Sequence, residues 1–459
     1  MASSNTRDAL LNEKPFKLML SLSIPAILGM VVIGLYNFMD SVFVGRMVSE
    51  NAMAAISIAY PFTLINSGIS TLIGMGSASV LSRAIGKKDQ KTVDKIMGNL
   101  IVIVFILSII STLIGCLFTE QLLTLSGASG ETFELASRYL KIVFIGSVFV
   151  NFSQSANMVM RGEGLLKKAM LIMALGAILN IILDPILIAL LNSSGKGIEG
   201  AAYATVIAQI IQAIITLVYF TTKSQNVKIN SLRLDGAILK EVLGVGVSGM
   251  MMQVLTLVQQ TLLFNVAAQY GGETAQIILA PLLRIQSFTF IPLWGISQGF
   301  QPVAGTNYGA KQYDRVKEVT KVFMVSATVL AAVFYIPIMC FPSQVISMFN
   351  KNMDIVAQSV GPLRIFYSIY IAFGMMIIAI TLFQALGKAG YAALLSMCRQ
   401  IILYIPLLLL MPKIGDLGLT GVWLAPTITD IIVSVIAIVL VLKEFKGLSK
   451  QKKQVAYSA

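Results

Sequence analysis

The chain has 459 residues, of which 56% are hydrophobic and 12% are charged, and its mean hydropathy is +0.83. Soluble domains carry about 25% charged residues, so this composition excludes an ordinary soluble domain and indicates a polytopic membrane protein. The formal net charge of +13 does not indicate nucleic-acid binding, because the basic residues lie in short connectors between apolar runs, as beside an anionic membrane face.

The cysteine and histidine content limits the available chemistry. Cys116, Cys340 and Cys398 are widely spaced and odd in number, so they predict neither a disulfide framework nor a metal site. The sequence contains no histidine, so any proton transfer has to use carboxylates.

A membrane-spanning helix needs about 20 apolar residues, and the sequence contains twelve runs of this kind. The predicted spans are 15–45, 52–82, 96–119, 134–160, 165–191, 198–222, 238–268, 274–300, 319–342, 355–385, 389–411 and 418–442. The polar leader 1–14 and the basic tail 443–459 lack apolar periodicity, and we expect both to be loose at their ends. No cleavage pattern follows a short apolar run, so the first span is expected to direct its own insertion.

The distribution of lysine and arginine predicts the orientation. The two termini and the connectors after the even-numbered spans, counted with the adjoining span ends, hold 25 basic residues, whereas the opposite connectors, counted in the same way, hold 6. By the positive-inside rule, both termini are expected to be cytoplasmic, in a multi-pass protein of the cell membrane.

The chain contains an internal repeat. The segment GKKDQKTVDK at 86–95 matches GAKQYDRVKE at 309–318 at an offset of 223, and the same offset places Gly164 on Gly387. We therefore predict an all-α protein with two six-helix lobes related by a parallel pseudo-two-fold axis. The lobes are 15–222 and 238–442, joined by a cytoplasmic connector at 223–237.

Polar residues of the first half fall at one depth in the membrane. Asp40 and Asp184 lie shortly before the ends of the first and fifth spans, and Thr205 lies shortly after the start of the sixth. At the rise of an α-helix, all three residues lie about 9–12 Å below the outer ends of their spans. Asn180 shares a helix face with Asp184. These side chains predict a site for a sodium ion or for protons, although Asn180 and Thr205 also suit helix–helix hydrogen bonds.

Three further residues support this site. Asn37 shares a helix face with Asp40, and Tyr139 has a similar depth, although a tyrosine there also suits the interfacial belt. Pro25 removes one backbone hydrogen bond from the first span and is expected to let it bend.

The repeat offset exposes an asymmetry. It places Asp40 on Leu263, Asn180 on Leu403 and Asp184 on Leu407. Because acids needed only for folding would be expected in both copies, we predict that cation coupling belongs to the first half alone.

A separate set of residues is predicted to line a substrate cavity in the second half. Amides in apolar surroundings suggest a partly polar cavity, and methionines suit varied apolar guests, although methionine also suits core packing. The candidates are Met252, Gln253, Gln259, Gln260, Met375, Gln384 and Asp430. Asp430 is a candidate contact for a cationic group, whereas Arg284, Arg364 and Arg399 are expected to snorkel or to pair near span ends.

No motif predicts an enzyme or a cofactor. GVGVSG at 244–249 matches a dinucleotide fingerprint, but it opens a membrane helix and follows no strand. No phosphate-binding loop, zinc motif or nucleophile–base set is present, so ATP-driven pumping is not supported.

At these residues the sequence resembles the multidrug and toxin extrusion (MATE) family of secondary exporters, over essentially its whole length. The resemblance is carried by Pro25 with Asp40, by NIILDP with Asn180 and Asp184, and by GAAYAT ending at Thr205. It implies two lobes in a V and a cation site in the first lobe made by Asp40, Asn180, Asp184 and Thr205. It also implies that Pro25 is the bending proline. The chain looks closer to the bacterial MepA-like and DinF-like members than to the branch with acids in the seventh and tenth helices.

The resemblance implies an antiporter that exports amphipathic, often cationic drugs against protons or sodium. The protein is expected to be a monomer. A lipid or lipid-linked oligosaccharide flippase of the same wider superfamily is the alternative function. A membrane-embedded enzyme or a passive channel is a further alternative, but neither a catalytic constellation nor a recognisable filter is present in the sequence.

Overall fold

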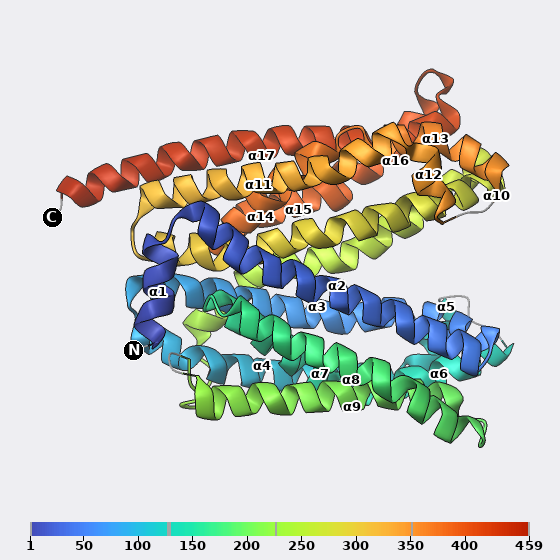
Figure 1. The fold of residues 1–459 in the computed structure, drawn as a ribbon, viewed down its shortest axis with the longest axis horizontal. Coiled ribbons are helices and arrows are strands. Elements are labelled where there is room, and N and C mark those ends of the chain that lie inside the picture. The colour runs from blue at the N-terminus through green and yellow to red at the C-terminus, as the bar shows by residue number, and fades with distance from the viewer. Residues whose placement is uncertain (1, 126–129, 225–226, 350–351, 458–459) are drawn as a thin grey trace. The chain divides into compact units, whose positions relative to one another are not determined.

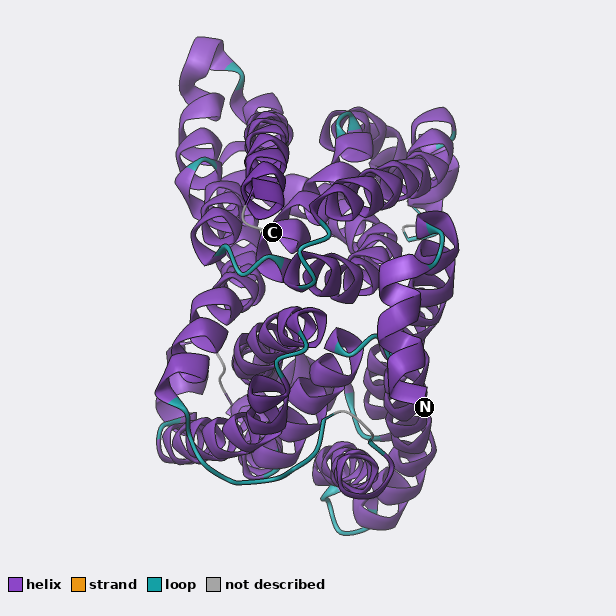
Figure 2. Cartoon of the chain, turned by 90° about the vertical axis from the view of Figure 1, so that its left-hand side faces the viewer, coloured by secondary structure: helices purple, strands orange, loops and turns teal. Residues whose placement is uncertain are grey.

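The computed structural model describes residues 2–125, 130–224, 227–349 and 352–457. Within these ranges the chain is helical with short connections and no strand (Figures 1 and 2). This is the expected result for a chain that crosses lipid, because helices satisfy their own backbone hydrogen bonds where water is absent. The fold class predicted from the sequence, an all-α polytopic protein with a duplicated helical scaffold, is confirmed.

The first repeat begins with a short amphipathic helix and continues with long apolar helices. Its elements are α1 (Ala2–Asn12), α2 (Pro15–Met47), α3 (Glu50–Lys87), α4 (Gln90–Leu117), α5 (Thr119–Leu125), α6 (Gly130–Ile145), α7 (Ser147–Gly162), α8 (Leu166–Asn192), α9 (Gly197–Val218) and the π-helical turn η1 (Tyr219–Lys223). Each predicted span of this half corresponds to one of these helices, except that the fourth is divided between α6 and α7, which meet at an angle of 55°.

The second repeat follows the same plan. Its elements are α10 (Gly236–Gly309), α11 (Tyr313–Cys340), α12 (Pro342–Ser347), α13 (Met353–Tyr367), α14 (Tyr370–Ala385), α15 (Ala389–Met397), the π-helical turn η2 (Cys398–Ile402), α16 (Tyr404–Leu410), the 3-10 helix η3 (Met411–Asp416) and α17 (Gly418–Tyr457). The tenth predicted span is divided between α13 and α14, which meet at 41°.

The sequence predicts twelve membrane spans, whereas the described part of the structure contains fewer helices that are long and apolar enough to cross a membrane. Helix α10 accounts for part of this difference. Nine helices of the described residues qualify, or eleven if each bent pair is one span. Helix α10 has 74 residues and is interrupted at Gly272, where φ is 63° and ψ is −156°. A straight helix of that length would measure about 110 Å, against a hydrocarbon core of about 30 Å. The predicted spans 238–268 and 274–300 are therefore the two arms of α10.

The repeat is visible in the backbone at the predicted offset of 223. Lys88 and Lys311 both have positive φ, at 59° and 60°, and Gly164 and Gly387 both have positive φ, at 87° and 74°. The hydrogen bonds agree, since the amide of Asp89 reaches the carbonyl of Ala84, as Gln312 reaches Asn307. The internal duplication inferred from sequence is thus confirmed at the ends of matching helices.

The chain divides into two compact units whose limits differ from those of the predicted lobes. Unit 1 contains residues 1–9 and 28–250, and unit 2 contains residues 10–27 and 251–459. The cuts fall inside α2 and α10, between 27 and 28 and between 250 and 251, which are 223 residues apart. Unit 1 therefore includes the first part of α10, and unit 2 includes the first part of α2.

Unit 1 has two hydrophobic clusters. The first lies among α3, α4 and α7 and includes Ile73, Leu81 and Val159, whereas the second lies among α3, α6 and α9 and includes Ala136 and Ile198. Helices α8 and α9 run side by side along their length (Figure 1). In unit 2, helices α11, α14 and α17 pack against one another.

The described residues of both terminal segments are helical and pack against neighbouring helices. In α1, Arg7 donates hydrogen bonds of 3.0 Å to the carbonyls of Ile85 and Gly86, at the end of α3, and Leu10 and Leu11 are buried. Helix α17 continues to Tyr457 because Leu448 is fully buried, and Ser449 accepts a hydrogen bond of 2.6 Å from Lys317 of α11. The sequence prediction overlooked these buried leucines, whereas looseness at the extreme ends falls partly on residues outside the described part of the structure and stays a prediction.

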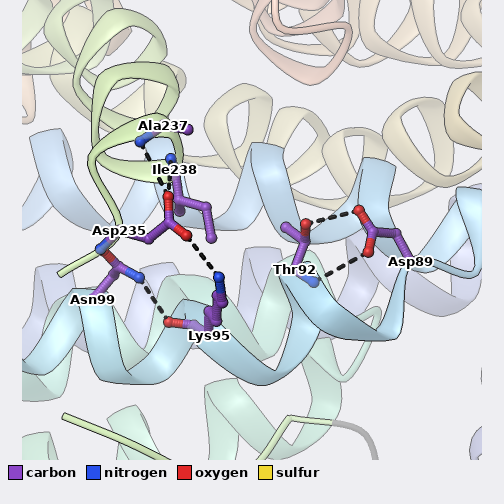
Figure 3. A network of polar contacts seen from close by, with 7 residues as sticks. All are labelled: Asp89, Thr92, Lys95, Asn99, Asp235, Ala237 and Ile238. Atoms are coloured by element: carbon purple, nitrogen blue, oxygen red, sulfur yellow. Dashed lines mark hydrogen bonds and ion pairs between the residues drawn. The ribbon is translucent and has the colours of Figure 1, made fainter. Parts of the chain in front are cut away.

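The connector before α10 is fixed to α4 by a polar network (Figure 3). The Asp235 carboxylate accepts from the amides of Ala237 and Ile238, and so caps α10, while Lys95 donates to its other oxygen at 2.7 Å. Asn99 of α4 accepts from the Asp235 amide at 2.7 Å. In the same network, Asp89 caps the start of α4 through Thr92.

The Lys95 hydrogen bond and the backbone donors hold the pKa of Asp235 below its ordinary value. A carboxyl with a lowered pKa stabilises the folded state at neutral pH. This contribution is complete above the ordinary pKa and is lost as the pH falls through the lowered value. The Asp235 carboxylate is therefore charged, and able to accept these hydrogen bonds, throughout the physiological pH range.

A close helix crossing in unit 1 generates the first prediction. A Cβ on Gly246 of α10 would overlap the backbone carbonyl of Leu72 in α3, and a Cβ on Gly76 would overlap that of Val242. Gly246→Ala is expected to lower stability by about 1–3 kcal/mol, because backbone atoms have to move apart. Gly236→Ala, where a Cβ meets nothing within 4 Å, is the control, and the measurement is the apparent melting temperature in detergent. Equal melting temperatures for the two variants would contradict the tight crossing.

The connector generates the second prediction. Asp235→Ala removes the cap of α10 and the partner of Lys95, so the connector should open more often. Trypsin cleavage after Arg233 should accelerate severalfold, as followed by gel analysis of the intact protein at neutral pH. Asp94→Ala, which alters an exposed acid on the same α4 helix, should leave the cleavage rate unchanged. If both variants are cleaved at the rate of the unmodified protein, the network does not hold the connector.

Candidate functional site

A contact between the C-terminal ends of α2 and α8 places two acids of unit 1 at the same depth. The Asn192 side chain at the end of α8 donates to the carbonyl of Met47, the last residue of α2, at 2.9 Å. Asp40 precedes Met47 by seven residues, and Asp184 precedes Asn192 by eight. At 1.5 Å per residue, both carboxylates lie about 10–12 Å from these joined ends. The common depth predicted from the sequence follows from this contact.

Helix α9 brings the hydroxyl of Thr205 to the same level. A Cβ on Gly200 would come within 2.6 Å of the Leu187 carbonyl oxygen, so only glycine allows α9 to lie this close to α8. The Asn180 amide then donates to Asp184 Oδ1 at 3.2 Å and to Thr205 Oγ1 at 3.3 Å. One amide thus links the acid of α8 to the hydroxyl of α9.

The site contains buried oxygen atoms without a hydrogen-bond donor. Relative exposure is 9% for Asp40, 0% for Asp184 and 2% for Asn180. Asp40 Oδ1, Asp184 Oδ2 and Asn180 Oδ1 are all buried and have no hydrogen-bond partner. A buried acceptor without a donor is costly, so three of them from one cluster indicate a place for a proton or a small cation.

Two tyrosines complete the surroundings of the acids. Tyr139 of α6 is 6% exposed, and both Tyr139 and Tyr36 interact electrostatically with Asp40 and Asp184. The structure therefore places the predicted Tyr139 beside the acids, and it adds Tyr36. Sequence reasoning missed Tyr36, although its position four residues before Asp40 puts both on one helix face.

The acids also interact with each other, because Asp40 acts electrostatically on Asp184. Two carboxylates close together in low dielectric resist being charged at once. The oxygens of Asp40, Asp184, Asn180 and Thr205 suit a sodium ion, which prefers hard oxygen ligands as calcium and magnesium do, and the carboxylate pair equally suits a proton. Among the described residues, no cluster of three or more His, Cys, Asp or Glu side chains suggests a transition-metal site.

The remaining first-half predictions have simpler outcomes. Pro25 lies inside α2, two residues before the point where the chain passes from unit 2 to unit 1, and its role in bending stays a prediction. The side chain of Asn37 lies outside the described part of the structure.

A small cavity adjoins the site in unit 1. Its lining includes Asn180 and Thr205 at one end and the amides of Gln154, Gln209 and Gln212 farther along. Gln209 accepts a hydrogen bond from Ser153 at 3.1 Å. Sequence reasoning did not select these glutamines, although Gln209 and Gln212 follow Thr205 at helical spacing on α9.

The predicted substrate residues of the second half lie in unit 2. Met252 lines a pocket there, Gln384 is buried, and the other amides and Met375 are half-buried. The carboxylate of Asp430 accepts a hydrogen bond of 2.9 Å from Arg399 Nε. The expectation that Arg399 pairs near a span end was wrong, because its partner is an acid well inside α17. Substrate contact by any of these residues stays a prediction.

The chain matches the family model MatE twice, over residues 25–186 and 249–410, together more than two thirds of its length. Among curated relatives, the "Multidrug export protein MepA" of Staphylococcus aureus (strain MSSA476) is 27% identical over 428 residues, which are 93% of each chain. The protein of the same description from Staphylococcus saprophyticus is also 27% identical over 428 residues, again 93% of each chain.

Solved structures of similar proteins share the fold. "Crystal structure of MATE in the bent conformation" aligns with a TM-score of 0.90 at 26% identity, covering 97% of this chain and 98% of the other. A Pyrococcus furiosus protein, described by "Reverse polarity of binding pocket suggests different function of a MOP superfamily transporter", aligns with a TM-score of 0.89 at 25% identity, covering 96% and 98%. The similarity extends over nearly the whole chain in both cases.

The bridge between α8 and α9 generates the third prediction. Thr205→Val keeps the side-chain shape but removes an acceptor from Asn180, so it should lower stability by about 1 kcal/mol. Thr205→Ser keeps the hydroxyl and should retain more of the original stability. The apparent melting temperatures of both variants in the same detergent provide the comparison. A valine variant as stable as the serine variant would show that this hydroxyl contributes nothing to the contact.

Proposed function

Because the chain belongs to the MatE family, we propose that it is a secondary active multidrug exporter of the cell membrane. It moves amphipathic, often cationic compounds outward in exchange for protons or sodium ions. The family membership and the drug-export names of its relatives support the transport class. The observation that supports coupling of drug export to a cation is a cluster of buried oxygens without a hydrogen-bond partner, which belong to Asp40, Asp184 and Asn180.

The cation site has the features that coupling requires. Intramembrane acids are expensive and usually functional, and in the proposed site the charge of Asp40 opposes a charge on Asp184. A proton neutralises one carboxylate and relieves this repulsion. A sodium ion achieves the same by taking oxygen ligands from Asp40, Asp184, Asn180 and Thr205.

Export then follows by alternating access and linkage. The cation and the drug each have to bind the inward-open and outward-open states with different affinity, since a ligand with equal affinity for both shifts nothing. Cation binding in the first repeat favours one state, and drug binding favours the other. The imposed cation gradient thereby drives drug release outside.

The membrane orientation follows from the charge distribution. The basic side chains of the termini and of the connectors after even-numbered spans belong on the cytoplasmic side. The cation site, near the joined ends of α2 and α8, then lies closer to the outer face. An incoming proton or sodium ion reaches it from the side on which either is more abundant.

Lipid flipping is less well supported than drug export. The curated relatives are described as multidrug export proteins, and none of the features above requires a lipid substrate. Drug-dependent counter-movement of protons or sodium distinguishes the two functions directly.

The fourth prediction concerns the two acids. Asp40→Asn and Asp184→Asn should each abolish gradient-driven efflux of a cationic dye from proteoliposomes, because each removes a carboxylate from the site. Asp94→Asn, at an exposed acid of α4 that contacts Gln90, should transport like the unmodified protein. All variants are first compared for membrane insertion and for elution as a single species. Full efflux by both acid variants would reject the cation site.

The same vesicles identify the coupling ion. A pH gradient and a sodium gradient are imposed separately, with the membrane potential clamped in both. Efflux under only one gradient names the ion, and dye movement that follows neither gradient would reject antiport.

A further inference from the structure

Arg399 and Asp430 form an ion pair in the interior of unit 2. The guanidinium Nε donates to Asp430 Oδ1 at 2.9 Å, and the two side chains are 14% and 19% exposed. The pair connects η2 to α17, which belong to the eleventh and twelfth predicted spans. Because two charges inside spans are costly to bury, a role beyond packing is expected of them.

The internal repeat places this pair at a hollow of unit 1. Subtracting the offset of 223 from Arg399 gives Gly176. For the last span the offset is 221, since α17 begins at Gly418 and α9 at Gly197, and this places Asp430 on Gln209. Positions 176 and 209 both line the cavity that adjoins the cation site of unit 1. The ion pair of unit 2 therefore stands where unit 1 has open, polar space.

The two hollows differ in size. The hollow of unit 1 has a volume of about 60 Å³, which is room for several water molecules. The hollow of unit 2 is lined at four of the same positions, by Ile377, Ser396, Arg399 and Gln400, and its volume is about 10 Å³, which is room for about one. The arginine side chain thus occupies space that a glycine leaves open in unit 1.

Unit 2 also lacks the oxygen ligands of the cation site. The positions that match Asp40, Asn180, Asp184 and Thr205 are Leu263, Leu403, Leu407 and Pro426. None of these side chains can bind a proton or a sodium ion. Unit 2 has therefore lost the ligands for a free cation and has gained a cation that belongs to the chain.

The last two spans of each repeat are linked by a polar contact. In unit 1 the Asn180 amide of α8 donates to Thr205 of α9 at 3.3 Å, within the cation site. In unit 2 the corresponding link is the ion pair between η2 and α17. The first link adjoins buried oxygens that lack a hydrogen-bond donor, whereas the second contains its own positive charge.

The guanidinium of Arg399 is held on more than one side. It lies 4.5 Å from the centre of the Phe373 ring, within the range of a cation–π interaction. Tyr404 is 2% exposed and interacts electrostatically with both members of the pair, and Tyr370 interacts with Arg399. The positive charge is therefore fixed in position beside the acid.

The backbone that carries Arg399 differs from its counterpart in unit 1. Arg399 lies in the π-helical turn η2, where the amide of Leu403 bonds to the carbonyl of Cys398. Such turns are rare and are frequent at functional sites. The matching stretch 175–179 is regular α-helix within α8. The change from glycine to arginine thus coincides with a local change of helix type.

From these observations we propose that Arg399 is the built-in counterpart of the transported cation. Its guanidinium permanently neutralises Asp430 and keeps the last two spans of unit 2 linked, so that unit 1 alone responds to a cation. The exchange of a cation in unit 1 rests on the proposed function, whereas the role of Arg399 inside unit 2 does not. Asp430 then serves as the partner of Arg399 and not as a contact for a cationic drug.

The proposal implies a latent cation site in unit 2. Without the arginine side chain, Asp430 is an acid that needs a positive partner, and the hollow gains the space of a guanidinium. Gln400 lines the same hollow and is 3% exposed, and its Oε1 is buried without a hydrogen-bond partner among the described residues. A carboxylate with an amide oxygen nearby suits a small monovalent cation.

Removal of the arginine side chain tests the proposal. Arg399→Ala is made in full-length protein that also carries Asp40→Asn and Asp184→Asn, so that the acids of unit 1 cannot respond. The apparent melting temperature in detergent is measured with millimolar guanidinium chloride or sodium chloride, with N-methylglucamine chloride keeping the ionic strength constant. Arg399→Ala should melt below its parent, and guanidinium should raise its melting temperature by about 3 °C or more. Sodium should act in the same direction.

Two further variants provide the controls. Adding Asp430→Asn to Arg399→Ala removes the acid and should abolish the response to both cations. Arg364→Ala removes an exposed arginine of α13 in the same unit and, like the parent, should show no response. If Arg399→Ala responds to neither cation, or if the response persists with Asp430→Asn, the proposal is overturned.

The folding of the variants is also informative. Recovery of Arg399→Ala as a single species only when guanidinium or sodium is present supports the proposal. Failure under every cation condition overturns it, because no free cation then replaces the arginine, whether or not Asp430→Asn restores folding. Arg399→Lys keeps a positive charge and should fold without a response to cations, and a cation response equal to that of Arg399→Ala would also contradict the proposal.

These measurements need neither a drug nor a gradient. Loss of antiport together with the expected cation response would refute the proposed function and leave the role of Arg399 in unit 2. Intact antiport without the cation response would refute the role of Arg399 alone.

Discussion

The mutual repulsion of two buried carboxylates is the interaction on which the proposed transport cycle depends. Asp40 and Asp184 are brought to one depth because Asn192 joins the ends of α2 and α8. The surrounding side chains satisfy these acids only in part, since one oxygen of each is buried without a donor. In the proposed cycle, a bound cation gives these oxygens a partner, and its departure leaves them without one again.

The duplicated scaffold explains how one chain can hold two different pockets. Matching positions line a hollow in each unit, and the backbone geometry at the ends of matching helices is the same in both repeats. What differs is a small number of side chains, such as Gly176 against Arg399 and Asp184 against Leu407. Duplication preserves the position of the hollow, and substitution within it changes the charge of its lining.

Much of the fold could be predicted because apolar length and repeated motifs are properties of the sequence alone. The bends between α6 and α7 and between α13 and α14 could not, since Gly146 at the first break is one of 36 glycines in the chain and the second break falls at Ser368 and Ile369. The buried leucines of the two terminal helices were missed for a similar reason. Leu10 and Leu448 are single apolar residues whose burial depends on neighbours far away in the chain.

The candidate site shows the same division. Depth and helix face could be counted from the sequence, which was enough to select Asp40, Asn180, Asp184 and Thr205 together, and their amide bridge is present. The sequence could not show which side chains pair between different helices. Arg399 and Asp430 are 31 residues apart in sequence, and only the packing of η2 against α17 shows that the acid is already paired.

The division of α2 and α10 between the compact units has a consequence for biosynthesis. Residues 10–27 are synthesised first but belong to the unit that is completed last, and unit 1 requires the chain as far as residue 250. A ribosome that has finished the sixth span has therefore not yet supplied everything the first unit needs. Either half of the gene expressed alone would lack a helix segment that one compact unit contains, residues 10–27 for unit 2 or the start of α10 for unit 1.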